Sequence, residues 1–140
     1  MKMPLPLPKD AIDAYAWFGN WPHWPAPGLG EAALLERMDR LAMRAAVVLP
    51  LAGAFCHAGD GNAELAGLVA RHPGRLVGIA AYDPRQSPSP RPIMEAARSA
   101  GLRGLALMPA NHGYVLGNEP AAEEALELAG AWGWPVYLPV

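Results

Sequence analysis

The hydrophobic positions of this chain alternate between two patterns. Short apolar runs predict five β-strands, and the longer stretches between them carry apolar residues at helical spacing and predict four helices. The predicted strands span residues 11–17, 45–51, 76–82, 102–108 and 135–140. The predicted helices lie within residues 31–43, 62–72, 92–101 and 118–133.

Two of the predicted strands differ in their patterns. Residues 45–51 are almost entirely apolar, which is typical of a parallel strand covered on both faces. Residues 12–17 alternate an aliphatic side chain with an aspartate or an aromatic one, which predicts a strand with two distinct faces. Asn62 is expected to cap the second helix, and residues 52–61 and 109–117 read as loops.

The order of the predicted elements indicates an α/β fold with a parallel sheet, because each strand is followed by one helix in units of about 30 residues. Two architectures remain open: a doubly wound sheet complete with five strands, or the first part of a (β/α)₈ barrel, which needs about 250 residues. No Gly-x-Gly-x-x-Gly follows the first strand, which argues against a dinucleotide-binding fold. We predict one domain over residues 1–140 that stops inside its fifth strand.

Composition narrows the functional classes. The net charge of −2 gives no reason to expect nucleic-acid binding. A single cysteine, Cys56, excludes an intrachain disulfide and is compatible with the cytoplasm, where we expect the protein. No run approaches the roughly 18 apolar residues of a membrane span. Only 17% of residues are charged, which indicates self-association.

Several segments resemble the N-terminal half of an amidohydrolase-related (β/α)₈ barrel, in the branch of aminocarboxymuconate-semialdehyde decarboxylase-like enzymes and dicarboxylate lactonases. They are IDAYAWFG (12–19), LLERMD (34–39), AVVL (46–49), HPGRLVG (72–78), GLRGL (101–105) and GWPV (133–136). The resemblance implies a partial TIM barrel of about strands one to five. It also implies a hydrolase or decarboxylase of small carboxylate or lactone substrates.

The resemblance further implies a divalent metal, usually zinc, held by a His-x-His at the end of strand one and a His on strand five. Tyr15 and Trp17 occupy the first two positions, and Leu138 or Pro139 occupies the third. None of these side chains is a suitable zinc ligand. We therefore expect no metal and no other cofactor in this chain.

Other residues are candidates for a catalytic role. His57 and His112 both follow predicted strands and could face one mouth of the sheet, and Asp83 follows the third strand. A His112–Asp83 or a His57–Asp60 pair could act as a general base. Cys56 lies in a loop beside His57, without the surroundings of a known nucleophile.

The aromatic first strand offers a binding alternative. Tyr15 and Trp17, together with Asn20 and Asn111 in the following loops, could line a pocket for a small molecule. Aromatic filler in place of a lost metal is the favoured explanation of the two aromatic residues.

Three functional hypotheses follow. The chain could be an amidohydrolase-type enzyme whose missing ligands come from a partner, or which works without metal. It could be a catalytically inactive pseudoenzyme that binds a small molecule, or a relic without activity. A half barrel exposes two sheet edges, so we expect self-association or pairing with a complementary half barrel.

Overall fold

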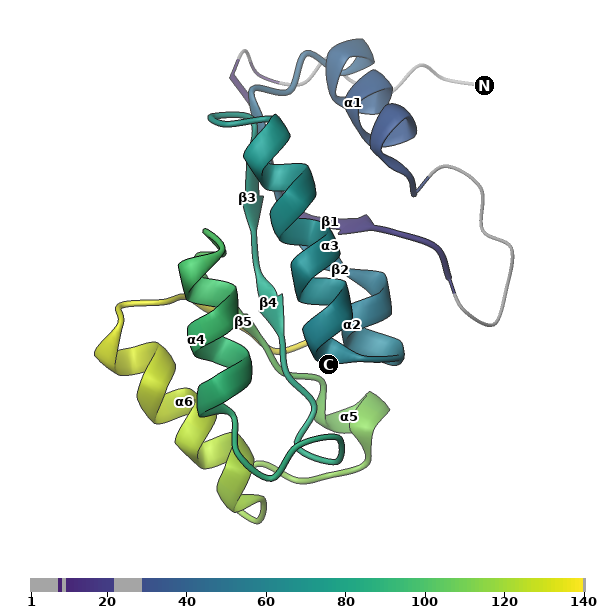
Figure 1. The fold of residues 1–140 in the computed structure, drawn as a ribbon. Coiled ribbons are helices and arrows are strands. Elements are labelled where there is room, and N and C mark those ends of the chain that lie inside the picture. The colour runs from purple at the N-terminus through teal and green to yellow at the C-terminus, as the bar shows by residue number, and fades with distance from the viewer. Residues whose placement is uncertain (1–7, 9, 22–28, 140) are drawn as a thin grey trace.

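The structure is a computed structural model of the 140-residue chain, and it describes residues 8, 10–21 and 29–139. Parallel strands and covering helices alternate along the chain, which confirms the α/β class (Figure 1). The strands are β1 (Ile12–Phe18), β2 (Ala45–Pro50), β3 (Leu76–Gly78), β4 (Ala80–Ala81), β5 (Leu105–Ala106) and β6 (Val136–Tyr137). The helices are α1 (Glu31–Arg40), α2 (Leu51–Phe55), α3 (Ala58–Arg71), α4 (Arg91–Ser99), α5 (Pro109–His112) and α6 (Pro120–Ala131).

The strands form two small parallel sheets, β1-β2-β3 and β4-β5-β6, which meet at one residue. Ile79 separates β3 from β4, and its N–H donates to the carbonyl of Val48 at 2.9 Å. The N–H of the next residue, Ala80, donates to the carbonyl of Gly104 at 2.9 Å. The predicted third strand therefore belongs to both sheets, and neighbouring strands follow each other in sequence order.

This sequential order favours a partial barrel over a doubly wound sheet, in which the strand order reverses. The curvature of the sheet also favours a partial barrel. The rings of Tyr15 on β1 and Tyr137 on β6, the first and last strands, stack with centroids 6.2 Å apart. Strands at opposite ends of the order can touch in this way only if the sheet bends round a concave face, which we call the inner face.

Side chains alternate between two cores. Ala46 and Val48 of β2 belong to the larger core, which includes buried residues of α1, α3, α4 and α6. Leu49 and its counterparts on β4 and β5, Ala81 and Ala106, form a smaller core on the inner face. This period of two places α1, α3, α4 and α6 on one face of the sheet, whereas Ala54 of α2 belongs to the inner core.

Two predicted loops are wrong. Residues 51–55 and 58–71 form α2 and α3, and residues 109–112 form α5. Gly53 and Gly61 explain the first error: a Cβ on Gly61 would collide with the backbone of Gly53, so the two helices pack backbone to backbone. Only small residues permit this approach, and they resemble a loop in the sequence.

Asn62 does not cap a helix as predicted, because His57 does so instead. Asn62 lies inside α3 with 3% of its surface exposed. Its amide nitrogen donates to the carbonyl of Ala81 at 2.9 Å, and its amide oxygen accepts from the N–H of Ala81 at 2.8 Å. The Asn62 side chain thus makes the two hydrogen bonds with β4 that a neighbouring strand would otherwise make.

The first strand also departs from simple alternation. The register between β1 and β2 shifts between Asp13 and Ala16, so the strand contains an irregularity of the β-bulge kind. Ile12 pairs with Ala45, and Trp17 pairs with Leu49 of the inner core. The shift places Tyr15 on the inner side while leaving 42% of its surface exposed.

Candidate active site

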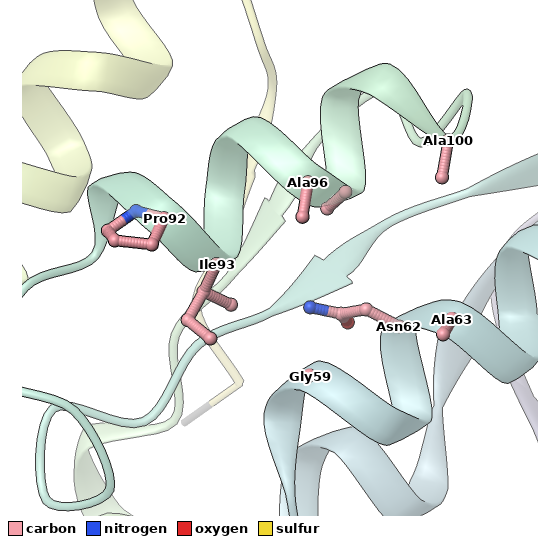
Figure 2. A pocket seen from close by; sticks show the side chains of 8 residues that line it. Gly59, Asn62, Ala63, Pro92, Ile93, Ala96 and Ala100 are labelled. Atoms are coloured by element: carbon pink, nitrogen blue, oxygen red, sulfur yellow. The ribbon is translucent and has the colours of Figure 1, made fainter.

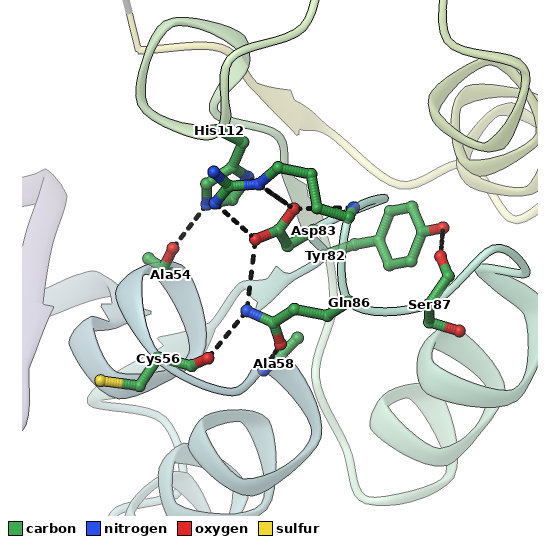
Figure 3. A network of polar contacts seen from close by, with 9 residues as sticks. Ala54, Cys56, Ala58, Tyr82, Asp83, Gln86, Ser87 and His112 are labelled. Carbon is green, nitrogen blue, oxygen red and sulfur yellow. Dashed lines mark hydrogen bonds and ion pairs between the residues drawn. The ribbon is translucent and has the colours of Figure 1, made fainter.

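The mouth of the partial barrel is the edge at which its strands end, and three segments meet there. Asp83 lies two residues after β4, on the same face as Ala81, and α5 follows β5 with His112 as its last residue. Gly113, at φ 69°, ends α5 in the left-handed region that glycine adopts without strain. Helix α2 follows β2 directly and supplies backbone carbonyls. Figure 3 shows the resulting network.

Asp83 is the centre of this network and is 1% exposed. Its Oδ1 accepts from the backbone N–H and the Nε of Arg85, both at 3.0 Å. Its Oδ2 accepts from Nη2 of Arg85 at 2.8 Å and from Nε2 of Gln86 at 3.2 Å. Four donors therefore occupy the carboxylate and compensate for its burial.

His112 lies beside Asp83 and is 2% exposed. Its Nε2 is 2.6 Å from the carbonyl oxygen of Ala54, so this nitrogen donates. Its Nδ1 is 3.7 Å from Oδ1 of Asp83, beyond hydrogen-bonding distance, and has no hydrogen-bond partner within the described residues. The predicted pair is thus brought together, with one ring nitrogen left unsatisfied.

The ionisation of the network follows from its contacts. Burial alone would raise the pKa of Asp83, but the hydrogen bonds from Arg85 and the positive charges nearby outweigh it and lower the pKa. Burial, together with the charge of Asp83, raises the pKa of Tyr114 to about 12. The Tyr114 hydroxyl is the second buried polar atom without a partner in the described part of the chain.

Gln86 connects this network to the turn between α2 and α3. Its Nε2 donates to the carbonyl of Cys56 at 2.8 Å, and its Oε1 accepts from the N–H of Ala58 at 3.1 Å. Neither Gln86 nor Arg85 was identified from the sequence. The signal was the Asp-Pro-Arg-Gln run, because Asp followed by Pro is typical of a turn in which the aspartate binds the next backbone N–H groups.

The other histidines have structural contacts. Nδ1 of His57 accepts from the N–H of Asp60 at 3.3 Å and caps α3, and it lies 3.2 Å from the carboxylate of Asp60. Both side chains of this pair are mostly exposed. His72 ends α3 before β3 and contacts Glu31. His23 lies outside the described residues.

Aromatic side chains line a cavity beside the mouth. A cavity of about 310 Å³ is bounded by Trp17, Trp21, Leu29, Leu51 and Phe55. Phe55 packs against both indoles, with ring centroids 5.8 Å from Trp17 and 4.6 Å from Trp21. Tyr15 meets Trp17 edge to face at 5.5 Å. Asn20 and Asn111, also predicted for this pocket, are exposed and do not line the cavity.

A second cavity, of about 160 Å³, lies between α3 and α4 (Figure 2). Ile93, Ala96 and Gly59 are among its small and apolar lining residues. Its polar side chain, Asn62, already binds Ala81. This cavity offers no free polar group among its lining residues, so it is not a candidate catalytic site.

The described residues do not fit the metal of the resembled family. No three His, Cys, Asp or Glu side chains among them lie close enough to hold a metal ion together. Tyr15 and Trp17 engage each other, and Leu138 is a half-exposed aliphatic side chain. Cys56 is a free, exposed thiol.

Comparison with known proteins identifies the fold. No protein-family model and no curated protein sequence matches this chain. A probable 2-pyrone-4,6-dicarboxylic acid hydrolase from Acinetobacter baumannii, solved with citric acid bound, matches with a TM-score of 0.67 and 17% identity over 92% of this chain. A protein designated an amidohydrolase from Staphylococcus aureus matches with a TM-score of 0.66 and 16% identity over 91%.

The matches cover 49% and 46% of those two proteins, so the chain spans about half of their length. None of its described helices is long and apolar enough to cross a membrane. The two matches show the fold of this chain, which corresponds to about half of each of those proteins.

Proposed function

We propose that this chain supplies one half of an amidohydrolase-type barrel that acts on a small molecule carrying a carboxylate or a lactone. The observation that supports this is the run of parallel strands in sequence order, together with the match of 92% of this chain to about half of a probable hydrolase. The polar network at the carboxyl ends of those strands supports it further, because active sites of such barrels lie at that end.

The substrate class comes from the neighbour. A 2-pyrone-4,6-dicarboxylate is a lactone with two carboxylates, and the citric acid bound in that structure is also a polycarboxylate. We transfer hydrolysis of a lactone from this neighbour to the present chain, and decarboxylation of a small acid is the other reaction that the family resemblance implies. The cytoplasm remains our proposed location.

The proposed site needs a second half to be closed. Strands β1 and β6 each have one unpaired edge among the described strands, and Tyr15 and Val77 expose 42% and 40% of their surfaces. Edges and apolar surface of this kind favour association. The second half can come from further residues of the same polypeptide, a separate chain or a second copy.

The proposed chemistry uses His112 rather than a metal. Nδ1 of His112 takes a proton from a water molecule as the water oxygen attacks the lactone carbonyl, and Asp83 stabilises the imidazolium. The ring C–O bond then breaks, and the leaving oxygen takes the proton from the His112 imidazolium, which returns the ring to its neutral form. The unpartnered Nδ1 beside a buried carboxylate supports these roles.

A catalytically inactive binding module is the alternative. It is favoured by the aromatic residues at the positions of the family's His-x-His and by the aromatic cavity beside them. A volume of about 310 Å³ is within the range of small-molecule sites. In this function the ligand is bound and not converted.

Lactone hydrolysis and native mass, measured on the same samples, separate the two functions. The probe is 2-pyrone-4,6-dicarboxylate, followed by ultraviolet absorbance, with the chain as prepared, after zinc and after a chelator. We expect an oligomer with chelator-resistant hydrolysis that His112→Gln abolishes at unchanged mass. A stable monomer that quenches tryptophan fluorescence on binding, without turnover, would instead establish the inactive module.

A further inference from the structure

Arg85 binds Asp83 with only one edge of its guanidinium. An arginine carries five side-chain N–H donors in a fixed plane. Two of them, one on Nε and one on Nη2, point to the two oxygens of Asp83 at 3.0 and 2.8 Å. Both hydrogens of Nη1 and the second hydrogen of Nη2 have no acceptor among the described residues. One hydrogen of Nη1 and the free hydrogen of Nη2 point in the same direction and form the Nη1/Nη2 edge.

This edge is both fixed and accessible. Asp83 is almost fully buried, while the Arg85 side chain is 56% exposed. The hydrogen bond to Asp83 raises the pKa of Arg85, so the guanidinium stays charged. A buried carboxylate that orients an exposed guanidinium removes most of the ordering cost that a free arginine bears on binding.

The surroundings of Arg85 point to a ligand rather than to a closed salt bridge. Asp83 already accepts four hydrogen bonds, and it faces His112 at 3.7 Å without a hydrogen bond. Nδ1 of His112, in a side chain 98% buried, is left unpartnered 3.7 Å from the same carboxylate. With the oxygens of Asp83 fully used, the remaining donors of Arg85 are open to an acceptor from outside the network.

We propose that Arg85 anchors a carboxylate of the ligand at the mouth through the Nη1/Nη2 edge of its guanidinium, with Asp83 as its positioning residue. The planar edge matches two carboxylate oxygens and gives two charge-assisted hydrogen bonds. This inference rests on the proposed function, because it names the contact that holds the small acid. It concerns binding alone, whereas turnover and association are measured separately.

The Asp83–Arg85 pair is neutral as a whole, which sets the expected strength. Coulomb attraction of a ligand to Arg85 is partly cancelled by Asp83 behind it, so affinity comes mainly from the directed hydrogen bonds. We expect glutarate, a flexible dicarboxylate, to bind in the millimolar range. Glutaramide, the uncharged diamide of the same length, should not bind.

The test is an NMR titration of the ¹⁵N-labelled full chain with glutarate, glutaramide serving as the chemical control. The expected result is a saturable shift of the Arg85 Nε–H resonance that glutaramide does not produce. Arg85→Lys keeps the charge without the planar edge and should weaken binding by at least about tenfold. Arg91→Lys, which alters an exposed arginine of α4, should leave it unchanged.

Two outcomes would overturn the proposal. One is a glutarate titration of the native chain that leaves Arg85 Nε–H unshifted while other arginines respond, or that shifts nothing. The other is equal binding to Arg85→Lys and the native chain. If Arg85→Lys does not fold, the native titration against glutaramide still decides. Binding at Arg85 without lactone turnover would uphold this contact while refuting catalysis.

Discussion

The chain builds two clusters of a carboxylate, an arginine and a histidine, and they differ in what they leave unfilled. In the outer cluster, Glu31 at the start of α1 binds both partners at the end of α3: His72 Nε2 at 2.6 Å and Arg71 Nη2 at 2.7 Å. In the mouth cluster, Asp83 is saturated by Arg85 and Gln86, and His112 stays at 3.7 Å.

Burial separates the two clusters further. The side chains of the outer cluster are between 23% and 55% exposed, so water can complete their hydrogen bonds. Asp83 and His112 are 1% and 2% exposed, so an unfilled position there costs free energy. A carboxylate, an arginine and a histidine therefore join two helices in one place and form a buried, incompletely hydrogen-bonded site in the other.

Asp83→Asn should cause the largest loss of unfolding free energy among the variants of the two clusters. It removes a buried charge and turns an amide N–H₂ towards donors that need acceptors, which should cost about 2–4 kcal/mol of unfolding free energy. Glu31→Gln, the matched change in the outer cluster, should cost less because its partners are solvated. Urea denaturation of both variants measures the difference, and equal losses would refute the contrast.

Replacing His112 or His72 by phenylalanine should have the second-largest effect on the free energy of unfolding. His112→Phe leaves the buried carbonyl of Ala54 without its donor and should cost about 1–3 kcal/mol. His72→Phe removes a contact to Glu31 that water can replace, so its loss should be smaller. Urea midpoints of the two variants give the ranking. A larger loss for His72→Phe would contradict the assigned burial.

The sequence could predict the fold because hydrophobic periodicity is local. Residues 45–51 and 31–43 read correctly as a covered strand and a helix, with ends differing by up to three residues. The sequence could not predict α2, because its helical state depends on a distant event. Gly53 must meet Gly61 closely, and that contact has no local signature.

The site was predictable in its residue types and not in its geometry. His112 and Asp83 follow strands, which indicated the same mouth, but their separation depends on α5, a four-residue helix that periodicity does not detect. The spacing also could not reveal that Arg85 would take the oxygens of Asp83. That contact depends on the turn after β4, which the Asp-Pro pair indicated only as a turn.

Gln86→Ala tests how far the mouth cluster extends. Gln86 joins Asp83 to the N–H of Ala58, so its loss should cost about 1 kcal/mol, mostly as local opening at the start of α3. Hydrogen exchange at the amide of Ala58 should become faster by several-fold. Glu95→Ala, which breaks an exposed pair on α4, is the control and should leave this amide unchanged.

The smallest effect is a pH dependence that belongs mainly to the outer cluster. Hydrogen bonds from Arg71 and then His72 lower the pKa of Glu31 from its ordinary 4.5 to about 2. Because the folded carboxyl binds its proton less readily than the unfolded one, its contribution to stability is complete above about pH 4.5 and is lost as the pH falls to about 2. Glu31→Gln should therefore flatten the rise of unfolding free energy with pH across this window. Asp83, whose pKa is also lowered, keeps part of the slope in that variant. Urea denaturation at pH values from about 2 to 5 measures the slopes, and an unchanged slope in Glu31→Gln would mean that the outer cluster does not form in solution.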